Sequence, residues 1–431
     1  MKKIVMKTGV SLVVACASTP LFASGFALGE QSISSMGTAL AGRTSSVEDA
    51  SIVYGNPAGM SRLKRQQATL GVTFIDARSD ISDASGTNRG VPIRGSNEGD
   101  MIPGFAVPMG FYVTPIDEHW TFGLGAYAPF GLAANYEDTF QGRNFGNKST
   151  VKVVTLQPTI SYAFNDRVSV GFGPTINRIS GALESALSLN PLLGDGRVKV
   201  KGDDVGYGFN VGIMAQVTDS TNVGLTYHSK VTYMLQGHTE IRPGAGTNPA
   251  LLREGRYEGT LDLNTPESAD FSVSQKLTDD WNLYLGSTWT RWSRIKDITV
   301  ENSGVTGAGG ALAPQLASTI TEPQNWHDTW AYALGTSYQL NKQWVLRTGL
   351  AVDQSPTNNV DRSPRIPTGD RTIFSIGAGW SPTQDITVDV AYSYLKEEEV
   401  KVDRSNALGQ RYRAKYENSA MGLGLGLTYR F

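Results

Sequence analysis

The sequence of 431 residues contains a single cysteine, Cys16, and only four histidines. One cysteine excludes an intrachain disulfide and a multi-cysteine metal site. The histidines are dispersed without metal-ligand spacing, so no metal site is expected. A membrane-spanning helix needs about 20 apolar residues in a row, and no such run follows the N-terminal segment. The formal net charge of -2 gives no support to nucleic acid as a partner.

What the chain does have is strict alternation in its last residues. Leu423, Leu425, Leu427, Tyr429 and Phe431 share one face, and glycine, threonine and arginine residues share the other. Such a strand fits between lipid and the interior of a barrel. The mean hydropathy of -0.23 agrees, because alternation hides lipid-facing residues in a soluble-looking average. A soluble edge strand with the same alternation is the alternative.

Short Asn/Asp-rich turns recur along the chain, each followed by an alternating run. They lie at 115–119, 165–167, 218–222, 278–280, 341–343 and 382–385. Longer polar stretches separate them, at about 77–101, 131–148, 185–202, 241–254, 302–324, 356–367 and 403–410. Short turns at one end and long loops at the other are typical of outer-membrane barrels. Six turns and seven loops predict an all-β protein, a transmembrane antiparallel β-barrel of about fourteen strands over residues 67–431.

The first 66 residues divide into two segments. Residues 1–23 combine lysines, an apolar core and a small-residue cleavage site, which predicts a secretory signal peptide cut after Ala23. A lipoprotein-type site at Cys16 is the alternative. Residues 24–66 are rich in Gly, Ala and Ser without alternation, and a barrel this wide has a water-filled lumen unless something fills it. We therefore expect this segment to fold inside as a hatch; a disordered periplasmic tail is the alternative, disfavoured by its spaced aliphatic residues.

Several motifs, in order along nearly the whole mature chain, resemble the FadL family of outer-membrane channels. They are Ser24-Gly25-Phe26, Gly37 to Gly42, Asn56-Pro57-Ala58, Tyr127 to Ala133, Gly208 to Gly212, Thr290 to Ser293, Gly349 to Pro356, Ile366-Pro367 and Asp370-Arg371. FadL members carry long-chain fatty acids and other hydrophobic molecules, and TodX-type members take aromatic hydrocarbons. The resemblance implies a fourteen-stranded barrel whose hatch contains Asn56, Pro57 and Ala58. It also implies passive transport, in which ligand passes from an extracellular groove to a lumenal site and leaves sideways at a kinked third strand.

The residues at the implied kink give it a physical basis. Pro129 lacks a donor for the strand ladder, and Gly131 can adopt backbone angles that other residues avoid. Pairing should therefore break around Pro129, Phe130 and Gly131, where the resemblance places a lateral gate. An ordinary strand end capped by proline and glycine is the alternative.

Alternation predicts a charged patch on the inner wall. If Trp326 and Trp330 face lipid, His327 faces the lumen, and the same count on the next strands turns Arg347, Asp353 and Arg371 inward. Cations at such a wall suit a carboxylate head group. The alternative is that these charges pair with one another and with the hatch.

The resemblance adds roles for particular residues. His327 falls near a basic ligand contact of fatty-acid transporters, and Phe26 matches an apolar contact to the bound chain. A second basic contact falls near Ser185, where this chain carries no charge. Five leucines in the loop at 182–193 are candidates for the extracellular capture groove: Leu183, Leu187, Leu189, Leu192 and Leu193. Packing of the loops on each other is the alternative.

The favoured function is uptake of long-chain fatty acids across the outer membrane of a Gram-negative cell. Channels for other hydrophobic compounds, including aromatic hydrocarbons or exported oxidised lipids, are the alternative, and an unspecific polar porin is a third. No catalytic residue and no cofactor are expected, because His228 and His327 are both predicted to face inward rather than toward a lipid-facing serine. Expected partners are outer-membrane lipid, lipopolysaccharide, and the barrel-assembly machinery at the terminal Phe431.

Overall fold

The computed structural model describes residues 25–431. The predicted signal peptide at 1–23, and with it the alternative site at Cys16, lies outside the described residues. Within the described part of the chain, no helix is long and apolar enough to cross a membrane.

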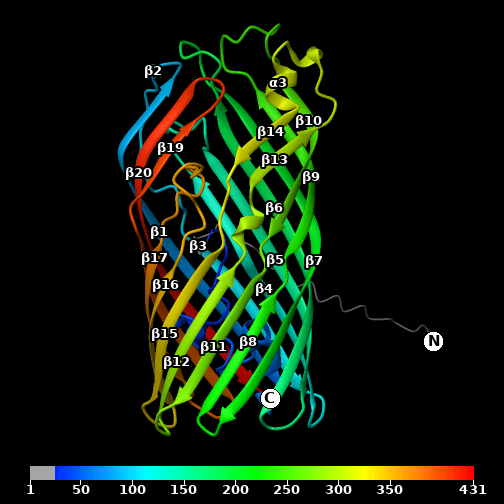
Figure 1. The fold of residues 1–431 in the computed structure, drawn as a ribbon, viewed down its shortest axis with the longest axis vertical. Helices are drawn as coiled ribbons and strands as arrows, with labels where there is room; N and C mark the ends of the chain where they lie inside the picture. The colour runs from blue at the N-terminus through cyan, green and yellow to red at the C-terminus, as the bar shows by residue number, and fades with distance from the viewer. Residues whose placement is uncertain (1–24) are drawn as a thin grey trace, which may run out of the picture.

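Twenty strand segments form one antiparallel sheet that closes on itself (Figure 1). They are β1 (Gln67–Asn88), β2 (Val91–Pro92), β3 (Phe105–Pro115), β4 (Trp120–Asn135), β5 (Lys148–Ala163), β6 (Val168–Leu187), β7 (Gly196–Thr218), β8 (Thr221–His228), β9 (Val231–Arg242), β10 (Gly255–Thr265), β11 (Ser268–Lys276), β12 (Trp281–Thr290), β13 (Asp297–Asn302), β14 (Thr319–Pro323), β15 (Thr329–Gln339), β16 (Trp344–Asp353), β17 (Arg371–Trp380), β18 (Ile386–Glu397), β19 (Val400–Ser405) and β20 (Gln410–Arg430). β2 is a short arm on β1, and five barrel strands are interrupted once: β8 with β9, β10 with β11, β12 with β13, β14 with β15, and β18 with β19. The barrel therefore has fourteen strands, and the predicted fold class is confirmed.

The six predicted short turns all connect neighbouring strands at one end of the barrel. At the other end several strands run further than expected. The predicted loop at 185–202 is mostly strand, because β6 extends to Leu187 and β7 begins at Gly196. The long loop at 302–324 carries α3 (Ala313–Ala317) and the 3-10 turn η3 (Gly307–Gly309), and a further 3-10 turn, η2 (Trp292–Arg294), lies where β12 is interrupted before β13.

The two faces of the last strand behave as the alternation indicated. Leu423 and Leu425 on β20 are each about half exposed on the outside of the barrel. Gly424, between them, faces inward, where a Cβ atom would lie 2.9 Å from the Ile33 side chain. Glycine is needed on this face because the N-terminal segment approaches the wall so closely.

The N-terminal segment lies inside the barrel, toward the end with the short turns (Figure 1). It contains α1 (Ile33–Met36), α2 (Ile52–Gly55) and η1 (Pro57–Arg62). Its polar contacts reach several walls: the Thr44 hydroxyl donates to the Gly224 carbonyl on β8 at 2.9 Å, and the Ala58 carbonyl accepts from Ser169 on β6 at 2.9 Å. The interior polar residues of the strands therefore bind the segment instead of water.

The hatch motif is built around Asn56, which is fully buried. Its amide nitrogen donates to the Thr44 carbonyl at 2.7 Å and to the Ile213 carbonyl on β7 at 3.0 Å. Its side-chain oxygen accepts from the Ala58 backbone N–H at 3.0 Å and so caps η1, with Pro57 at the first position. One side chain thus links two parts of the segment to the wall.

Candidate functional site

Four aromatic side chains meet inside the barrel, and we call them the aromatic cluster: Phe26, Phe130, Trp292 and Trp326. The Phe26 ring centroid lies 5.6 Å from Phe130, 5.1 Å from Trp292 and 6.0 Å from Trp326. Phe26, Trp292 and Trp326 are each at most 6% exposed. The cluster joins the N-terminal segment to β4 and to the loops flanking β13 and β14.

The chain around Phe26 pairs with β4 through its backbone. The Leu28 N–H donates to the Pro129 carbonyl at 2.8 Å, and the Gly131 N–H donates to the Phe26 carbonyl at 2.8 Å. The Gln31 amide adds a bond to the Ala128 carbonyl at 2.7 Å. A few residues of the N-terminal segment therefore act as a strand partner for β4.

β4 is irregular at the same place. Its register with β5 shifts between Tyr127 and Phe130, so one extra residue bulges from the strand, and β4 then continues to Asn135. Pro129 and Gly131 thus lie inside a bulged strand rather than at a strand end.

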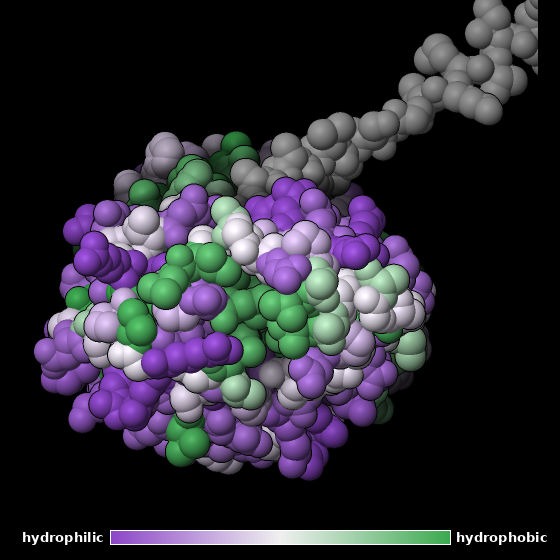
Figure 2. Space-filling model, turned by 90° about the horizontal axis from the view of Figure 1, so that it is seen from above, coloured by the Kyte–Doolittle hydropathy of each residue, from purple (hydrophilic) through white to green (hydrophobic). Residues whose placement is uncertain are grey.

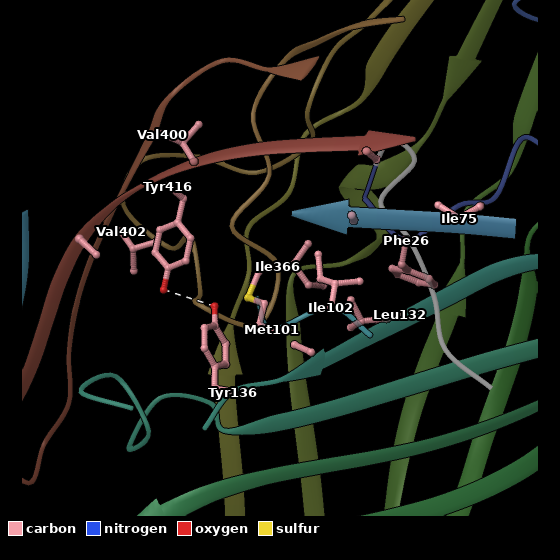
Figure 3. Close-up of a cluster of buried hydrophobic side chains, with 14 of the residues drawn as sticks. Phe26, Ile75, Met101, Ile102, Leu132, Tyr136, Ile366, Val400, Val402 and Tyr416 are labelled. Atoms are coloured by element: carbon pink, nitrogen blue, oxygen red, sulfur yellow. Dashed lines mark hydrogen bonds between the residues drawn. The ribbon is translucent and has the colours of Figure 1, made fainter. Parts of the chain in front are cut away.

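An apolar cavity lies on the extracellular side of Phe26, and we call it the upper cavity. It encloses about 890 Å³ of space not filled by atoms, part of it open to solvent. Its lining includes Phe26, Leu132, Ile179, Leu235, Trp326 and Ile366. Figure 3 shows Phe26, Leu132 and Ile366 together in the surrounding hydrophobic core.

A strap, residues 354–370, helps to line this cavity with Arg365 and Ile366, and its second half, residues 362–369, is buried. Arg365 fixes the strap, because its Nε donates to Glu322 at 3.0 Å and its Nη1 to the Ser149 hydroxyl at 2.8 Å. Nη1 also contacts the carbonyls of Lys148 and Glu184, each at 3.1 Å. This guanidinium is therefore used to hold the loop.

A second, more polar cavity lies beside the N-terminal segment, and we call it the lower cavity. It encloses about 1400 Å³ of unfilled space, part of it open to solvent, and Pro129 and Phe130 are among its lining residues. Arg43 forms an ion pair with Asp270 on β11 and donates to the Thr288 hydroxyl at 3.1 Å. Phe26 lines the upper cavity and Phe130 the lower, so the aromatic cluster lies between the two.

Glu30 also lines the lower cavity, on the N-terminal segment. Burial raises the pKa of its carboxyl, while its backbone hydrogen bonds and the charges of Arg371 and Arg43 act in the opposite direction. A carboxyl in this position favours the protonated form more than one in water does.

The predicted inner-wall charges form ion pairs. Arg371 and Asp353, on β17 and β16, lie 3.0 Å apart and both line the lower cavity. Arg347 donates to Asp389 on β18 at 2.6 Å and lies 3.4 Å from Glu48 of the N-terminal segment. This arrangement matches the alternative in which the charges hold the segment in place.

The prediction that His327 faces the lumen is wrong. His327 is exposed, and its backbone N–H donates to the Pro356 carbonyl at 3.1 Å. Alternation fails here because β15 begins only at Thr329, so the preceding residues are not a strand. For the same reason Trp326, expected to face lipid, turns inward into the aromatic cluster.

Several site residues were missed by sequence reasoning, among them Trp292, Glu30 and Arg43. Trp292 belongs to a motif that was noticed, but its place in η2, where β12 is interrupted, was not. Glu30 and Arg43 lie in a segment without periodicity, so no pattern could orient their side chains.

The five leucines assigned to the capture groove separate in the structure. Leu183 lines the upper cavity, while Leu187 and Leu189 pack in a loop cluster with Ile241 and Leu252. Leu192 is 85% exposed and Leu193 is 38% exposed. Figure 2 shows hydrophobic residues gathered at the centre of this end of the molecule, ringed by polar ones.

A closed barrel with an apolar outer face and a lumen that holds its own N-terminal segment defines a β-barrel channel of the outer membrane. The profile of the family described as outer membrane protein transport protein (OMPP1/FadL/TodX) matches residues 14–431, and the chain belongs to this family. Its family relatives are outer-membrane proteins, and the outer membrane is its location.

Three relatives illustrate how far the similarity extends. The long-chain fatty acid transport protein of Salmonella typhi is 27% identical, over 100% of this chain and 99% of its own. Outer membrane protein P1 of Haemophilus influenzae is 27% identical, over 95% of each chain. The crystal structure of a Pseudomonas aeruginosa FadL homologue superposes with a TM-score of 0.85 at 27% identity, over 94% of this chain and 100% of that one.

Proposed function

We propose that this protein carries long-chain fatty acids passively across the outer membrane and releases them sideways through the barrel wall at β4. Its membership in the FadL family supports transport of hydrophobic compounds, and a relative of matching length is named for long-chain fatty acids. No catalytic step is part of this proposal.

The observation that carries lateral release is the unequal pairing of β3 and β4. Their ladder ends at Gly110↔Ala126. Beyond it, Phe105 to Met109 pair only with β1. On the other side, β4 pairs with β5 and with the chain near Phe26. The wall between β3 and β4 therefore lacks backbone hydrogen bonds on the side of the aromatic cluster.

The two cavities supply a route to that place. A hydrocarbon chain entering the upper cavity meets an apolar lining, which favours transfer from water. Phe26 lines this cavity, and its neighbour in the aromatic cluster, Phe130, lines the lower one together with Pro129. Release requires the backbone hydrogen bonds between the N-terminal segment and β4 to break. The two cavities would then join beside the stretch of wall where β3 and β4 are unpaired. In this scheme Phe26 contacts the ligand chain.

Uptake of labelled oleate by a deletion strain, complemented with variants, tests the proposal. Gly131→Val places a branched side chain beside the unpaired wall, and uptake should fall at least 5-fold. Ala126→Val is the matched control, because this outward residue lies where β3 and β4 are still paired. Equal uptake by both variants, at equal amounts of surface protein, would count against lateral release. Liposome swelling with sugars tests the polar porin alternative.

A second cargo class, neutral hydrophobic molecules, is favoured by the charge of the upper cavity. Of the three basic residues in its lining, Arg365 directs its Nε and Nη1 donors to the strap contacts, and His238 lies 3.2 Å from both Glu240 and Arg256. Lys201, the cross-strand partner of His238, is exposed on the outside of the barrel. A carboxylate would gain little from these groups, so an alcohol or hydrocarbon of equal length should bind about as well. A fatty acid that binds 10-fold tighter than its alcohol would exclude this candidate.

A further inference from the structure

Three cationic side chains lie close together on the outside of the barrel, and we call them the basic triad: Lys152 on β5, Arg178 on β6 and Lys201 on β7. Ser180 lies at their centre, directly paired with Lys152 on one side and with Asp203 on the other. Arg178 lies two residues before Ser180 on β6, and Lys201 lies two residues before Asp203 on β7, both on the same face of the sheet. Strand geometry places the Cα atoms of the triad roughly 5–8 Å from that of Ser180, so the long side chains can reach one ligand.

The basic triad marks the edge of the lipid-facing surface. On the same three strands, toward the short turns, the outward residues are apolar and exposed: Val154, Leu156, Ile176, Val205 and Tyr207 are between 43% and 73% exposed. Beyond the triad, away from the short turns, the outward positions of these strands include the charged residues Lys148, Glu184 and Lys199. The short turns of such barrels lie in the periplasm, so the triad lies at the head-group level of the outer leaflet.

The charges of the triad are not balanced by the protein. Arg178 lies 3.3 Å from Asp203, but neither Lys152 nor Lys201 has an ion pair within the described chain. Nearer the extracellular end of the same three strands every cation has an ion pair, because Lys199 and Arg197 lie 3.3 and 3.6 Å from Glu184, and Lys148 lies 3.7 Å from Asp138. Within ion-pair distance the triad therefore has one carboxylate, Asp203, while Glu240 interacts with Lys201 over a longer distance.

A different wall of the barrel offers a comparison at a similar height. There, Lys396 lies 2.7 Å from Glu417, and Lys415 lies 2.8 Å from Asp83. Arg78 has Asp76 at 4.0 Å. Each of these three cations has its own carboxylate, whereas Arg411 and Arg413, further toward the extracellular end of the same wall, share Asp403. The three cations nearest the membrane on this wall therefore differ from the triad.

We propose that the basic triad binds the phosphate groups of lipopolysaccharide in the outer leaflet. Ammonium and guanidinium groups form charge-assisted hydrogen bonds to phosphate oxygens, and the Ser180 hydroxyl can donate one more. The acyl chains of such a lipid would lie on the exposed apolar residues next to the triad. Each cation near a membrane surface contributes roughly a 5-fold gain in affinity for an anionic lipid, so the three together supply on the order of 100-fold.

The test uses the full-length protein, purified in a nonionic detergent, stripped of lipid and titrated with purified bisphosphorylated lipid A; bound lipid is counted by native mass spectrometry. The test variant combines Lys152→Gln, Arg178→Gln and Lys201→Gln. The control combines Arg78→Gln, Lys396→Gln and Lys415→Gln on the balanced wall. Heat-modifiable migration on gels verifies that both barrels are folded.

The test variant should lose at least 10-fold in affinity for bisphosphorylated lipid A, and the control less than 3-fold. Dephosphorylated lipid A should bind the wild type no more tightly than it binds the test variant. Equal losses in the two variants would overturn the assignment, as would full competition by millimolar inorganic phosphate, which would mark a plain anion site. Oleate uptake should be unchanged in the double variant Lys152→Gln with Arg178→Gln, because neither residue lines the upper or the lower cavity; this separates the result from the proposed transport function.

Discussion

Replacement of Phe26 by alanine should open the barrel to small polar solutes. Phe26 lines the upper cavity and belongs to the aromatic cluster that lies between it and the lower cavity, packed against Phe130, Trp292 and Trp326. Without the ring the two cavities merge. The backbone bonds between the N-terminal segment and β4 also lose the packing that shields them.

The size of the effect follows from burial. Truncating a buried phenylalanine costs about 3–5 kcal/mol, and each favourable aromatic pair adds roughly 0.5–1.5 kcal/mol. Part of this free-energy cost destabilises the state in which the N-terminal segment is bound to β4. A loss of about 3 kcal/mol multiplies the population of the released state roughly 150-fold, which is enough to turn rare openings into frequent ones.

Conductance of purified protein in planar bilayers measures this directly. Phe26→Ala should conduct ions at a level several times that of wild type, and it should bind a fluorescent fatty acid about 10-fold more weakly. Phe374→Ala is the control, because Phe374 on β17 is 43% exposed on the outer face and borders neither cavity. It removes the same side chain from lipid and should leave both readings unchanged.

A folded Phe26→Ala barrel with wild-type conductance and wild-type ligand affinity would refute the reasoning. It would mean that the cavities are separated by other groups, and that the aromatic cluster serves stability alone.

Three further outcomes follow from the same contacts. Deleting Pro129 removes the single-residue bulge and lets β4 run straight, so oleate uptake should fall at least 5-fold while the barrel still folds. Arg347→Gln leaves Asp389 buried without a cation and should cost about 3–5 kcal/mol, seen as a lower thermal midpoint. Because the pKa of Glu30 is raised above 4.5 in the folded state, the contribution of this carboxyl to stability should be greatest below pH 4.5 and be lost as pH rises through the folded pKa; the difference in thermal midpoint between wild type and Glu30→Gln should therefore change between pH 4 and 8.

Each of these has a result that speaks against it. Normal uptake after deletion of Pro129 would show that the bulge is not needed for release. The double variant Arg347→Gln with Asp389→Asn should recover most of the lost stability, and a double variant as unstable as the single one would contradict the ion-pair argument. A pH profile that is identical in wild type and Glu30→Gln would show that this carboxyl is not shifted by folding.

The barrel itself was predictable because each strand carries its own signal. Strict alternation, as in Leu423 to Phe431, and Asn/Asp-rich turns are local features, and they specify strand number and the lipid-facing side without any knowledge of neighbours. The same rule put Arg347, Asp353 and Arg371 on the inner face. It failed at His327 and Trp326, because alternation holds only while the backbone remains a strand.

The partners of the inner residues required the tertiary structure. Sequence left open whether Arg371 attracts a ligand or pairs with Asp353, since that choice depends on the register of β16 with β17. Nothing local places Glu30 or Arg43, because the N-terminal segment has no period and takes its shape from the walls around it.

The sequence alone therefore determined a two-faced fourteen-stranded barrel and the residues that face lipid, since both depend on spacing within single strands. Only the tertiary structure decided where β3 and β4 are unpaired, that the aromatic cluster lies between the two cavities, and which charged side chains form ion pairs. Those properties arise from contacts between segments hundreds of residues apart, and their energies depend on distances that no local pattern records.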